Sequence, residues 1–270
     1  MKLLFWNLQG KKPLDEAAEL IHEVDCDIAA FCECSDDFAA DVQVQLNALY
    51  SKGYRHQETP GCNRIKVLVR DALNSISLLN QHKYFSLMLL KQGAQRLILA
   101  FVHMPSKLHS GEDELRSLCE KLTHQISAEE MANDVQDSLV IGDFNVNPFE
   151  SPIISFSGLL ATNSMDCVER DQWTRKGDTK RVFFNPMWSL YAQHLHQPGS
   201  HHYRRLTEDV IEWHFLDQVI IRASLISKFS LPDLRLVDST TRFSFRKKSG
   251  KPFVSDHLPI SCRLNLAGGI

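Results

Sequence analysis

The sequence contains no long hydrophobic stretch. No segment approaches the roughly 18 consecutive apolar residues that a membrane helix needs, and the opening apolar run, residues 3–6, is too short for the hydrophobic region of a signal peptide. These absences exclude a membrane helix and favour a cytoplasmic protein. Hydrophobic residues make up 43% of the 270 residues and charged residues 23%, which is enough for a sizeable core. No repeat or low-complexity linker divides the chain, so we expect a single domain over residues 1–270.

The sequence also lacks a cysteine framework. Its seven cysteines are an odd number spread over the whole chain, which favours reduced thiols over disulfides. Cys26, Cys32 and Cys34 lie close together, but no second Cys/His pair with zinc-finger spacing accompanies them. Cys32 and Cys34 flank Glu33 on a predicted strand, so we expect both to face away from Glu33. Packed core cysteines are therefore favoured over a zinc site.

The net charge of −3 is unevenly distributed. Residues 170–251 hold 15 Lys and Arg against 8 Asp and Glu, a balance of +7, so the rest of the chain carries −10. A basic segment in a mildly acidic protein suits a polyanionic partner, although a solvated face has the same composition.

Short apolar runs alternate with amphipathic stretches along the chain. The pattern predicts strands at residues 2–8, 27–34, 64–70, 75–79, 84–90, 96–103, 138–144, 215–222 and 253–265, and helices at 13–24, 36–50 and 112–132. Residues 150–212 are predicted to form long functional loops around one or two strands. This order indicates an α/β fold, a four-layer sandwich of two mixed β-sheets packed face to face with helices on the outside.

Polar residues repeatedly follow or enter the apolar runs. Six segments have this property, and they contribute Asn7, Glu33, His103, Asp143 with Asn145, Asp217, and Asp256 with His257. A carboxylate buried alone costs several kcal/mol, so such acids need partners or a metal. Because strand ends can meet at one edge of a sheet sandwich, we expect these side chains to form one site.

Each residue taken alone has a structural interpretation. Asn7 is also a good strand-end cap, and Glu33 and Asp217 suit structural ion pairs. His103 suits a satisfied core histidine, and the Asp143–Asn145 segment suits a turn in which Asx side chains bond the backbone. Asp256 and His257 suit a helix or turn cap. The six coincidences together, in this order, favour a shared site.

The motifs LLFWNLQG, DIAAFCE, FVHMPS, IGDFNVNPFES, FLDQVII and VSDHLPI span residues 3–260. In these motifs the chain resembles the endonuclease/exonuclease/phosphatase superfamily, whose members are metal-dependent phosphoesterases with a four-layer sandwich. The chain departs from it at Gln218, where many members carry an aromatic residue.

The resemblance implies a role for each residue of the predicted site. Glu33 resembles the main metal-binding carboxylate, supported by Asn7 and Asp256, and these hard oxygen ligands suit Mg²⁺ or Mn²⁺. Asp143 resembles the residue that orients or deprotonates the attacking water, and Asn145 an amide donor to the phosphate. His257 resembles the imidazole that binds the scissile phosphate, oriented by Asp217, while His103 contacts the phosphate or assists the leaving oxygen.

Two segments of the basic region are candidate substrate contacts. Residues 201–205 include Arg204 and Arg205, and residues 242–248 include Arg246, Lys247 and Lys248. Basic residues interleaved with aromatic ones suit a nucleic-acid backbone with stacked bases. The alternative for the second segment is a solvated hairpin whose phenylalanines face the core. Trp188 and Trp173 are candidate base-stacking platforms, or else buried core residues.

The sequence therefore favours a divalent-metal-dependent phosphodiester hydrolase, most of all a nuclease acting on DNA or RNA. The first alternative is a phosphatase or phosphodiesterase for a small phosphorylated molecule or a phospholipid headgroup. Against the lipid version, the sequence has no recognisable exposed hydrophobic hairpin. The second alternative is a binding module without activity, which the complete set of competent residues disfavours.

Overall fold

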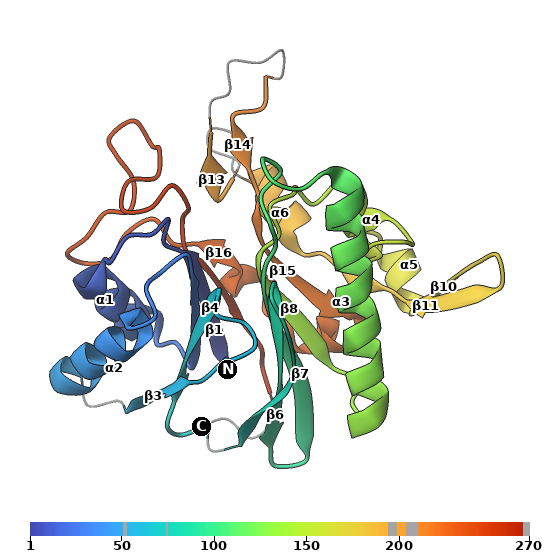
Figure 1. Ribbon diagram of the computed structural model, residues 1–270, viewed down its shortest axis with the longest axis horizontal. Helices are drawn as coiled ribbons and strands as arrows, with labels where there is room; N and C mark the ends of the chain where they lie inside the picture. Colours follow the sequence, from blue (N-terminus) through green and yellow to red (C-terminus); the bar gives the residue numbers. More distant parts are fainter. Residues whose placement is uncertain (51–52, 74, 194–198, 204–209, 267–270) are drawn as a thin grey trace.

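The computed structural model describes the chain except residues 51–52, 74, 194–198, 204–209 and 267–270. Two large mixed β-sheets lie face to face, and helices cover the outer face of each (Figure 1). This arrangement is the four-layer α/β sandwich that the sequence predicts. Among the described helices, none is both long enough and apolar enough to span a membrane.

The first sheet has the strand order β16–β17–β1–β2–β4–β3. β1 pairs in parallel with β2, and the other pairs are antiparallel. Its strands are β1 (Lys2–Asn7), β2 (Ile28–Cys32), β3 (Tyr54–Gln57), β4 (Ile65–Arg70), β16 (Arg235–Leu236) and β17 (Ile260–Arg263). The helices α1 (Leu14–Val24) and α2 (Phe38–Leu49) pack on its outer face.

The second sheet has the strand order β5–β6–β7–β8–β15–β12–β9. Two pairs, β7 with β8 and β12 with β9, are parallel. Its strands are β5 (Ile76–His82), β6 (Phe85–Gln92), β7 (Gln95–His103), β8 (Ser138–Asp143), β9 (Ala161–Thr162), β12 (Phe183–Phe184) and β15 (Asp217–Arg222). The long helix α3 (Glu112–Asn133) packs on its outer face.

The strands have two faces because successive side chains point to opposite sides of a sheet. On β1, Leu3 and Phe5 face the other sheet, whereas Leu4 and Trp6 face the helices. The same alternation holds on β7, β8 and β15, which are buried along almost their whole length. Such strands have both faces covered, which explains their nearly continuous apolar sequence.

The segment 150–212 is more ordered than the sequence predicts. Its described residues contain three short helices and five short strands, in place of one or two strands within loops. They are α4 (Ser151–Ile154), β9, α5 (Met165–Glu169), β10 (Gln172–Arg175), β11 (Asp178–Arg181), β12, α6 (Met187–Gln193) and β13 (His201–His202), which pairs with β14 (Trp213–His214). Elements of two to seven residues are too short to give a readable hydrophobic period.

The C-terminal prediction also needs correction. Residues 253–265 do not form one strand, because β17 covers only Ile260–Arg263 and residues 253–259 lead into it as a loop. Two 3₁₀ helices, η1 (Ala223–Lys228) and η2 (Leu231–Asp233), precede β16.

The cysteines are packed as core residues, but their directions differ from the prediction. Cys32 lies in the layer between the sheets, whereas Cys26 and Cys34 belong to the layer beneath α1 and α2. The strand ends at Cys32, and Glu33 adopts a left-handed backbone conformation (φ 51°). Cys32 and Cys34 therefore do not share a face, and the three thiols do not converge on a zinc site.

Candidate active site

The register of three neighbouring strands brings three predicted residues together. His103 at the end of β7 is paired with Asp143 at the end of β8, and Asp143 is paired with Asp217 at the start of β15. All three stand on the side of the sheet that faces the other sheet, continuing the alternation of the core residues below them. They are buried, with exposed fractions of 5%, 1% and 0%. The site thus begins where the central apolar layer ends.

Gly142 permits this approach of β7 and β8. Its φ is +151°, and a Cβ atom there would lie 2.0 Å from the carbonyl oxygen of Val102. Only glycine fits such a contact without a shift of the backbone. The glycine of the IGDFN motif therefore has a packing role next to Asp143.

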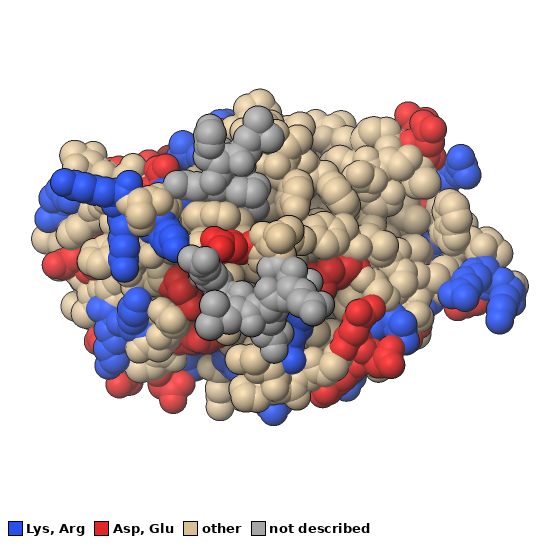
Figure 2. All heavy atoms as spheres, turned by 90° about the horizontal axis from the view of Figure 1, so that it is seen from above, with Lys and Arg blue, Asp and Glu red and all other residues tan. Residues whose placement is uncertain are grey.

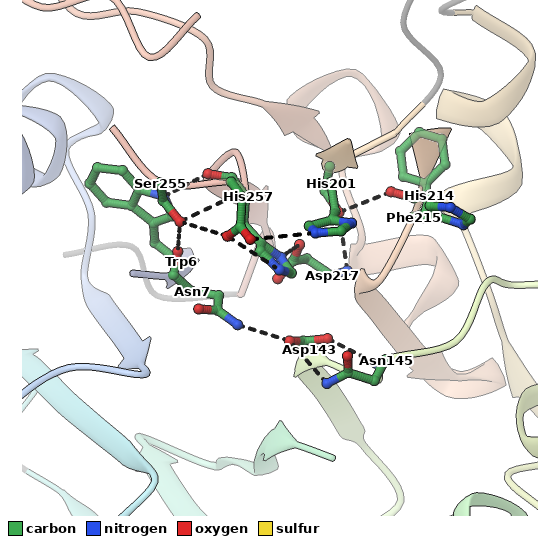
Figure 3. Close-up of polar contacts among 12 residues, drawn as sticks. Trp6, Asn7, Asp143, Asn145, His201, His214, Phe215, Asp217, Ser255 and His257 are labelled. Carbon is green, nitrogen blue, oxygen red and sulfur yellow. Dashed lines mark hydrogen bonds and ion pairs between the residues drawn. The ribbon is translucent and has the colours of Figure 1, made fainter. Parts of the chain in front are cut away.

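Asn7 joins the first sheet to this group. Its side-chain amide donates to Glu33 Oε1 at 3.1 Å. The same amide donates to Asp143 Oδ2 at 2.9 Å (Figure 3). Asn7 lies on the inner face of β1, whereas a continued β2 would have pointed Glu33 towards α1 and α2. The left-handed turn at Glu33 reverses this direction, so the carboxylate reaches Asn7 and lies 3.2 Å from His103 Nε2. The hydrogen bond from His103 is the main reason that the pKa of Glu33 is lowered.

His257 and Asp217 form the most deeply buried ion pair of the site. His257 Nδ1 lies 2.7 Å from Asp217 Oδ2, and the His257 backbone carbonyl accepts a bond from Trp6 Nε1 at 3.0 Å. Burial disfavours the charged imidazole, but Asp217, followed by Asp143 and Asp256, outweighs this effect and raises the pKa of His257 to about 10. The imidazole is therefore cationic at neutral pH.

Hydrogen bonds from Asn145, in the turn that follows, and from Asn7, in the other sheet, hold the Asp143 carboxylate. Its Oδ1 accepts from the Asn145 backbone N–H at 2.8 Å, and its Oδ2 accepts from Asn7 and, at 3.3 Å, from the Asn145 amide. The Asx-turn interpretation of this segment is thus confirmed, and it places the carboxylate in the site at the same time. Burial raises the pKa of Asp143, which makes it a better proton acceptor than a solvated aspartate.

His201 belongs to the site, although the sequence suggested only a contact loop there. Its ring lies 4.5 Å from the ring of His257, and its Nε2 lies 3.6 Å from Asp256 Oδ2 (Figure 3). A backbone bridge to His257 and a bond from Leu258 N–H to Ser200 O (2.7 Å) hold this segment. A two-residue strand gives no apolar run, so no sequence signal marked His201. Ser255, which donates to the Asn7 carbonyl at 2.7 Å, was also missed, although it lies within the SDH motif.

Three overlapping groups of side chains have the geometry of metal sites. They are Glu33 with His103 and Asp143, then Asp143 with Asp217 and His257, and lastly His201 with Asp256 and His257; within each, the ligand atoms lie within 4.8 Å of one another. Among the described residues, Asp217 Oδ1 and His103 Nδ1 are buried without a hydrogen-bond partner. Such atoms and hard oxygen donors together fit a divalent cation. Of the predicted metal ligands, Glu33 and Asn7 contact each other. Asp256, the third, contacts His201 and His257 instead.

Three of the predicted substrate contacts, Arg246, Lys247 and Lys248, lie in the loop region that leads to Asp256 and His257. Arg246 is half-buried, donates to the Gly250 carbonyl at 2.9 Å and lies over the ring of Trp213. Lys247 and Lys248 are exposed. Figure 2, which views the molecule from above, shows Lys and Arg side chains gathered at the left. Phe245 is buried against Trp6, and Phe243 is partly buried, so the phenylalanines face the core as the alternative interpretation held. Arg204 and Arg205 lie outside the described residues.

The two predicted stacking residues flank a separate cavity. Trp188 is half-buried on α6, and Trp173 on β10 is 41% exposed, so neither is a fully buried core residue. The hairpin formed by β13 and β14 projects from the site face (Figure 1). It exposes apolar side chains, among them Val210 (92%) and Ile211 (44%), and the sequence gave no sign of such a hairpin.

Comparisons with known proteins agree with this architecture. No family model and no curated protein matches the sequence. Among solved structures, truncated TDP2 from Caenorhabditis elegans is similar over 97% of this chain and 96% of its own, with a TM-score of 0.58 and 15% identity.

Two further structures have the same fold. An endonuclease/exonuclease/phosphatase family protein from Leptotrichia buccalis is similar over 98% of this chain and 100% of its own, with a TM-score of 0.57 and 12% identity. TDP2 from D. rerio, complexed with a single-strand DNA product, is similar over 98% and 99%, with a TM-score of 0.54 and 14% identity. The chain thus has the fold of the endonuclease/exonuclease/phosphatase superfamily.

Proposed function

We propose that the protein is a divalent-metal-dependent phosphodiester hydrolase whose substrate is DNA or RNA. One observation carries this proposal: side chains from six distant segments converge at the end of the sandwich, where most of them are buried and where hydrogen bonds, ion pairs or ligand atoms within 4.8 Å of one another connect them. Burying several acids and imidazoles together is unfavourable unless they serve a ligand or each other. A cationic imidazole, a basic carboxylate and hard oxygen donors in one place match the needs of phosphodiester hydrolysis.

The proton-accepting residue is Asp143. It is buried, its pKa is raised, and Asn7 and Asn145 fix its orientation. Such a carboxylate can align a water molecule and accept its proton as the oxygen attacks phosphorus. Asn145, whose amide donates to Met104 O at 2.9 Å and faces Asp143, is the nearby amide donor for a phosphate oxygen.

The charge of the phosphate is matched by His257. Its Nδ1 is bound to Asp217, so the other ring nitrogen is the one available to a phosphate oxygen. A fixed cationic donor stabilises negative charge that grows in the transition state, and removing one such donor typically costs about 10²–10³ in rate. His103, held against Glu33, is the second imidazole that can serve the phosphate or the leaving oxygen.

Glu33 is the residue best suited to hold the metal, with Asn7 beside it and Asp256 as the third proposed ligand. The Glu33 side chain is 42% exposed and its pKa is lowered, so it is an accessible anion. These donors suit Mg²⁺, or Mn²⁺, which when bound would neutralise phosphate charge and polarise the phosphorus–oxygen bonds.

A nucleic-acid substrate is supported by two observations. Exposed Lys247 and Lys248 lie in the loop region that leads to Asp256 and His257, and one structure of the same fold, from D. rerio, holds a single-strand DNA product. The second candidate is a phosphodiesterase for a phospholipid headgroup, which the exposed Val210 and Ile211 of the projecting hairpin favour.

A substrate panel tests the proposal. The purified protein is incubated with Mg²⁺, Mn²⁺ or EDTA and with single- and double-stranded DNA and RNA, inositol and sugar phosphates, or phospholipid vesicles. We expect metal-dependent cleavage of nucleic acid, reduced about 10⁴-fold in Asp143→Ala and about 10³-fold in His257→Ala. Asp113→Asn, on the exposed face of α3, is the matched control. Cleavage that survives both site substitutions would exclude this site, and activity on vesicles alone would establish the second candidate.

A further inference from the structure

A cavity of about 470 Å³ is lined by residues from β9, β10, α4, α5 and α6 and shares none of the residues of the polar centre. No charged side chain lines it. Its walls include four aromatic side chains: Phe149 (36% exposed), Phe156, Trp173 (41% exposed) and Trp188. Thr162 and Asn163 add polar atoms at one edge. Large flat rings and few polar groups are typical of a site for a neutral planar molecule, and the volume lies within the usual range for small-ligand pockets.

One loop of the backbone connects the cavity wall to the polar centre. Phe149 lies on the loop that follows Asn145, and this loop is tied back by Asn147. The Asn147 side chain accepts from Phe215 N–H at 3.0 Å and donates to His214 Nδ1 at 3.1 Å. Phe215 lies two residues before Asp217. The wall of the cavity is therefore fixed to the strand that orients the catalytic imidazole.

Aromatic contacts form a second connection. Trp188 lies 6.3 Å from Tyr191 between ring centroids, Phe149 lies 6.1 Å from Tyr191, and Tyr191 lies 5.7 Å from Phe215. These rings form one packed group between the centre and the cavity.

The third connection explains the unusual glutamine of the FLDQVII motif. Gln218 is fully buried on the outer side of β15; its amide donates to Val146 O at 2.7 Å, and its Oε1 accepts from Asn185 at 2.9 Å. Asn185 also accepts from Met187 N–H at 3.0 Å at the start of α6. Gln218, the neighbour of Asp217 on β15, thus connects two elements to this strand. One is α6, which carries Trp188, and the other is the loop that carries Phe149. Buried polar groups that are fully bonded rigidify their surroundings.

We infer that this cavity is a nucleobase subsite, which holds one unstacked base of the strand whose phosphate lies at the polar centre. The inference rests on the proposed function. A base has a face that aromatic rings stack upon and an edge that Thr162 and Asn163 can bond, whereas none of the lining side chains is a cation that would bind a phosphate. Exposed Arg175 is the last residue of β10 and exposed Lys176 follows it in the turn of the hairpin that carries Trp173, where a strand leaving the cavity along this hairpin would meet them.

An abasic scan tests this assignment. Short single-stranded DNA and RNA substrates, each lacking one base, are compared by kcat/KM in Mg²⁺. For the wild-type chain, loss of the base at one fixed distance from the cleaved bond should lower kcat/KM by roughly 5- to 100-fold, the range for stacking one base. In Trp173→Ala, kcat/KM on the intact substrate should fall by a similar factor, mainly through a higher KM. This variant should cleave the intact substrate and that abasic substrate with the same kcat/KM. Trp173→Phe should restore most of the loss.

Val44→Ala, which removes an exposed apolar side chain on α2, is the matched control and should change nothing. If no oligonucleotide is cleaved by the wild-type chain, the proposed function fails and the inference with it. If oligonucleotides are cleaved but Trp173→Ala behaves like Val44→Ala, only the subsite is refuted. Loss of binding to phosphatidylcholine vesicles in Trp173→Ala, with unchanged cleavage of oligonucleotides, would assign the cavity to an acyl chain instead.

Discussion

The polar centre and the rim around it are built in different ways. In the centre, Asn7, Asp143 and Asp217 are at most 1% exposed, stand on long buried strands and bond to one another. On the rim, Lys247, Lys248 and Trp173 are exposed and stand on loops or a short hairpin. A buried network is hard to vary one residue at a time, whereas an exposed side chain is easily replaced. The centre is therefore suited to a fixed chemistry and the rim to the choice of substrate.

The largest effect should follow from changing the centre at Asp217. In Asp217→Asn the pKa of His257 should fall from about 10 towards its ordinary 6.5, because the main neighbouring charge is lost. The imidazole would then be mostly neutral above neutral pH, and kcat should fall by about 10³-fold. A histidine NMR titration measures the pKa, and an unchanged value would contradict the pairing.

The same change has a consequence for stability. A raised pKa in the folded state means that the pair stabilises the protein fully below pH 6.5, and that this contribution is lost as pH rises through about 10. In urea unfolding, the free energy of unfolding of the wild type should therefore exceed that of Asp217→Asn by much more at pH 6 than at pH 10.

The next effect concerns the packing that assembles the centre. Gly142→Ala should lower the free energy of unfolding by about 3 kcal/mol, because the new methyl group meets the Val102 carbonyl at 2.0 Å. Gly177→Ala, where φ is +85° and nothing lies within 4 Å, should cost only about 1 kcal/mol of backbone strain. If the two variants lose the same free energy of unfolding in denaturant, the positive φ of the glycine, rather than its contact with β7, causes the loss.

The smallest effect should come from the rim. Replacing Lys247 and Lys248 by Ala should leave kcat unchanged, weaken nucleic-acid binding and reduce the slope of log affinity against log salt by about 1.5 to 2. Lys91→Ala with Lys121→Ala, which removes two exposed lysines elsewhere, is the control. An unaltered slope in binding titrations would remove this loop from the interface.

The centre could be predicted from the sequence where a long strand ends in a polar residue. His103, Asp143 and Asp217 follow or open apolar runs, and strand pairing then aligns them. Glu33 was predicted as a site residue, but its left-handed turn was not. That conformation is set by contacts with Asn7 and His103, which lie far away in the sequence.

For the rim, the sequence predicts which basic and aromatic residues are present but not where they lie. His201, on a two-residue strand, reaches the centre through an isolated backbone bridge to His257, and Trp173 reaches the cavity on a hairpin of two four-residue strands. Such elements take their position from tertiary contacts, so their own sequence contains little information about it. The buried bond between Gln218 and Asn185 is of the same kind, because neither residue signals its distant partner.

The pairing of His103, Asp143 and Asp217 across three adjacent strands also makes the proposed catalysis depend on correct folding. A slip of two residues between β8 and either neighbour would keep every apolar side chain on its proper face, yet it would move the paired side chains about 7 Å apart. A misaligned sheet could thus be compact and still inert. Turnover per molecule would then report the fraction of chains with correct strand alignment, which spectroscopic measures of secondary structure cannot distinguish.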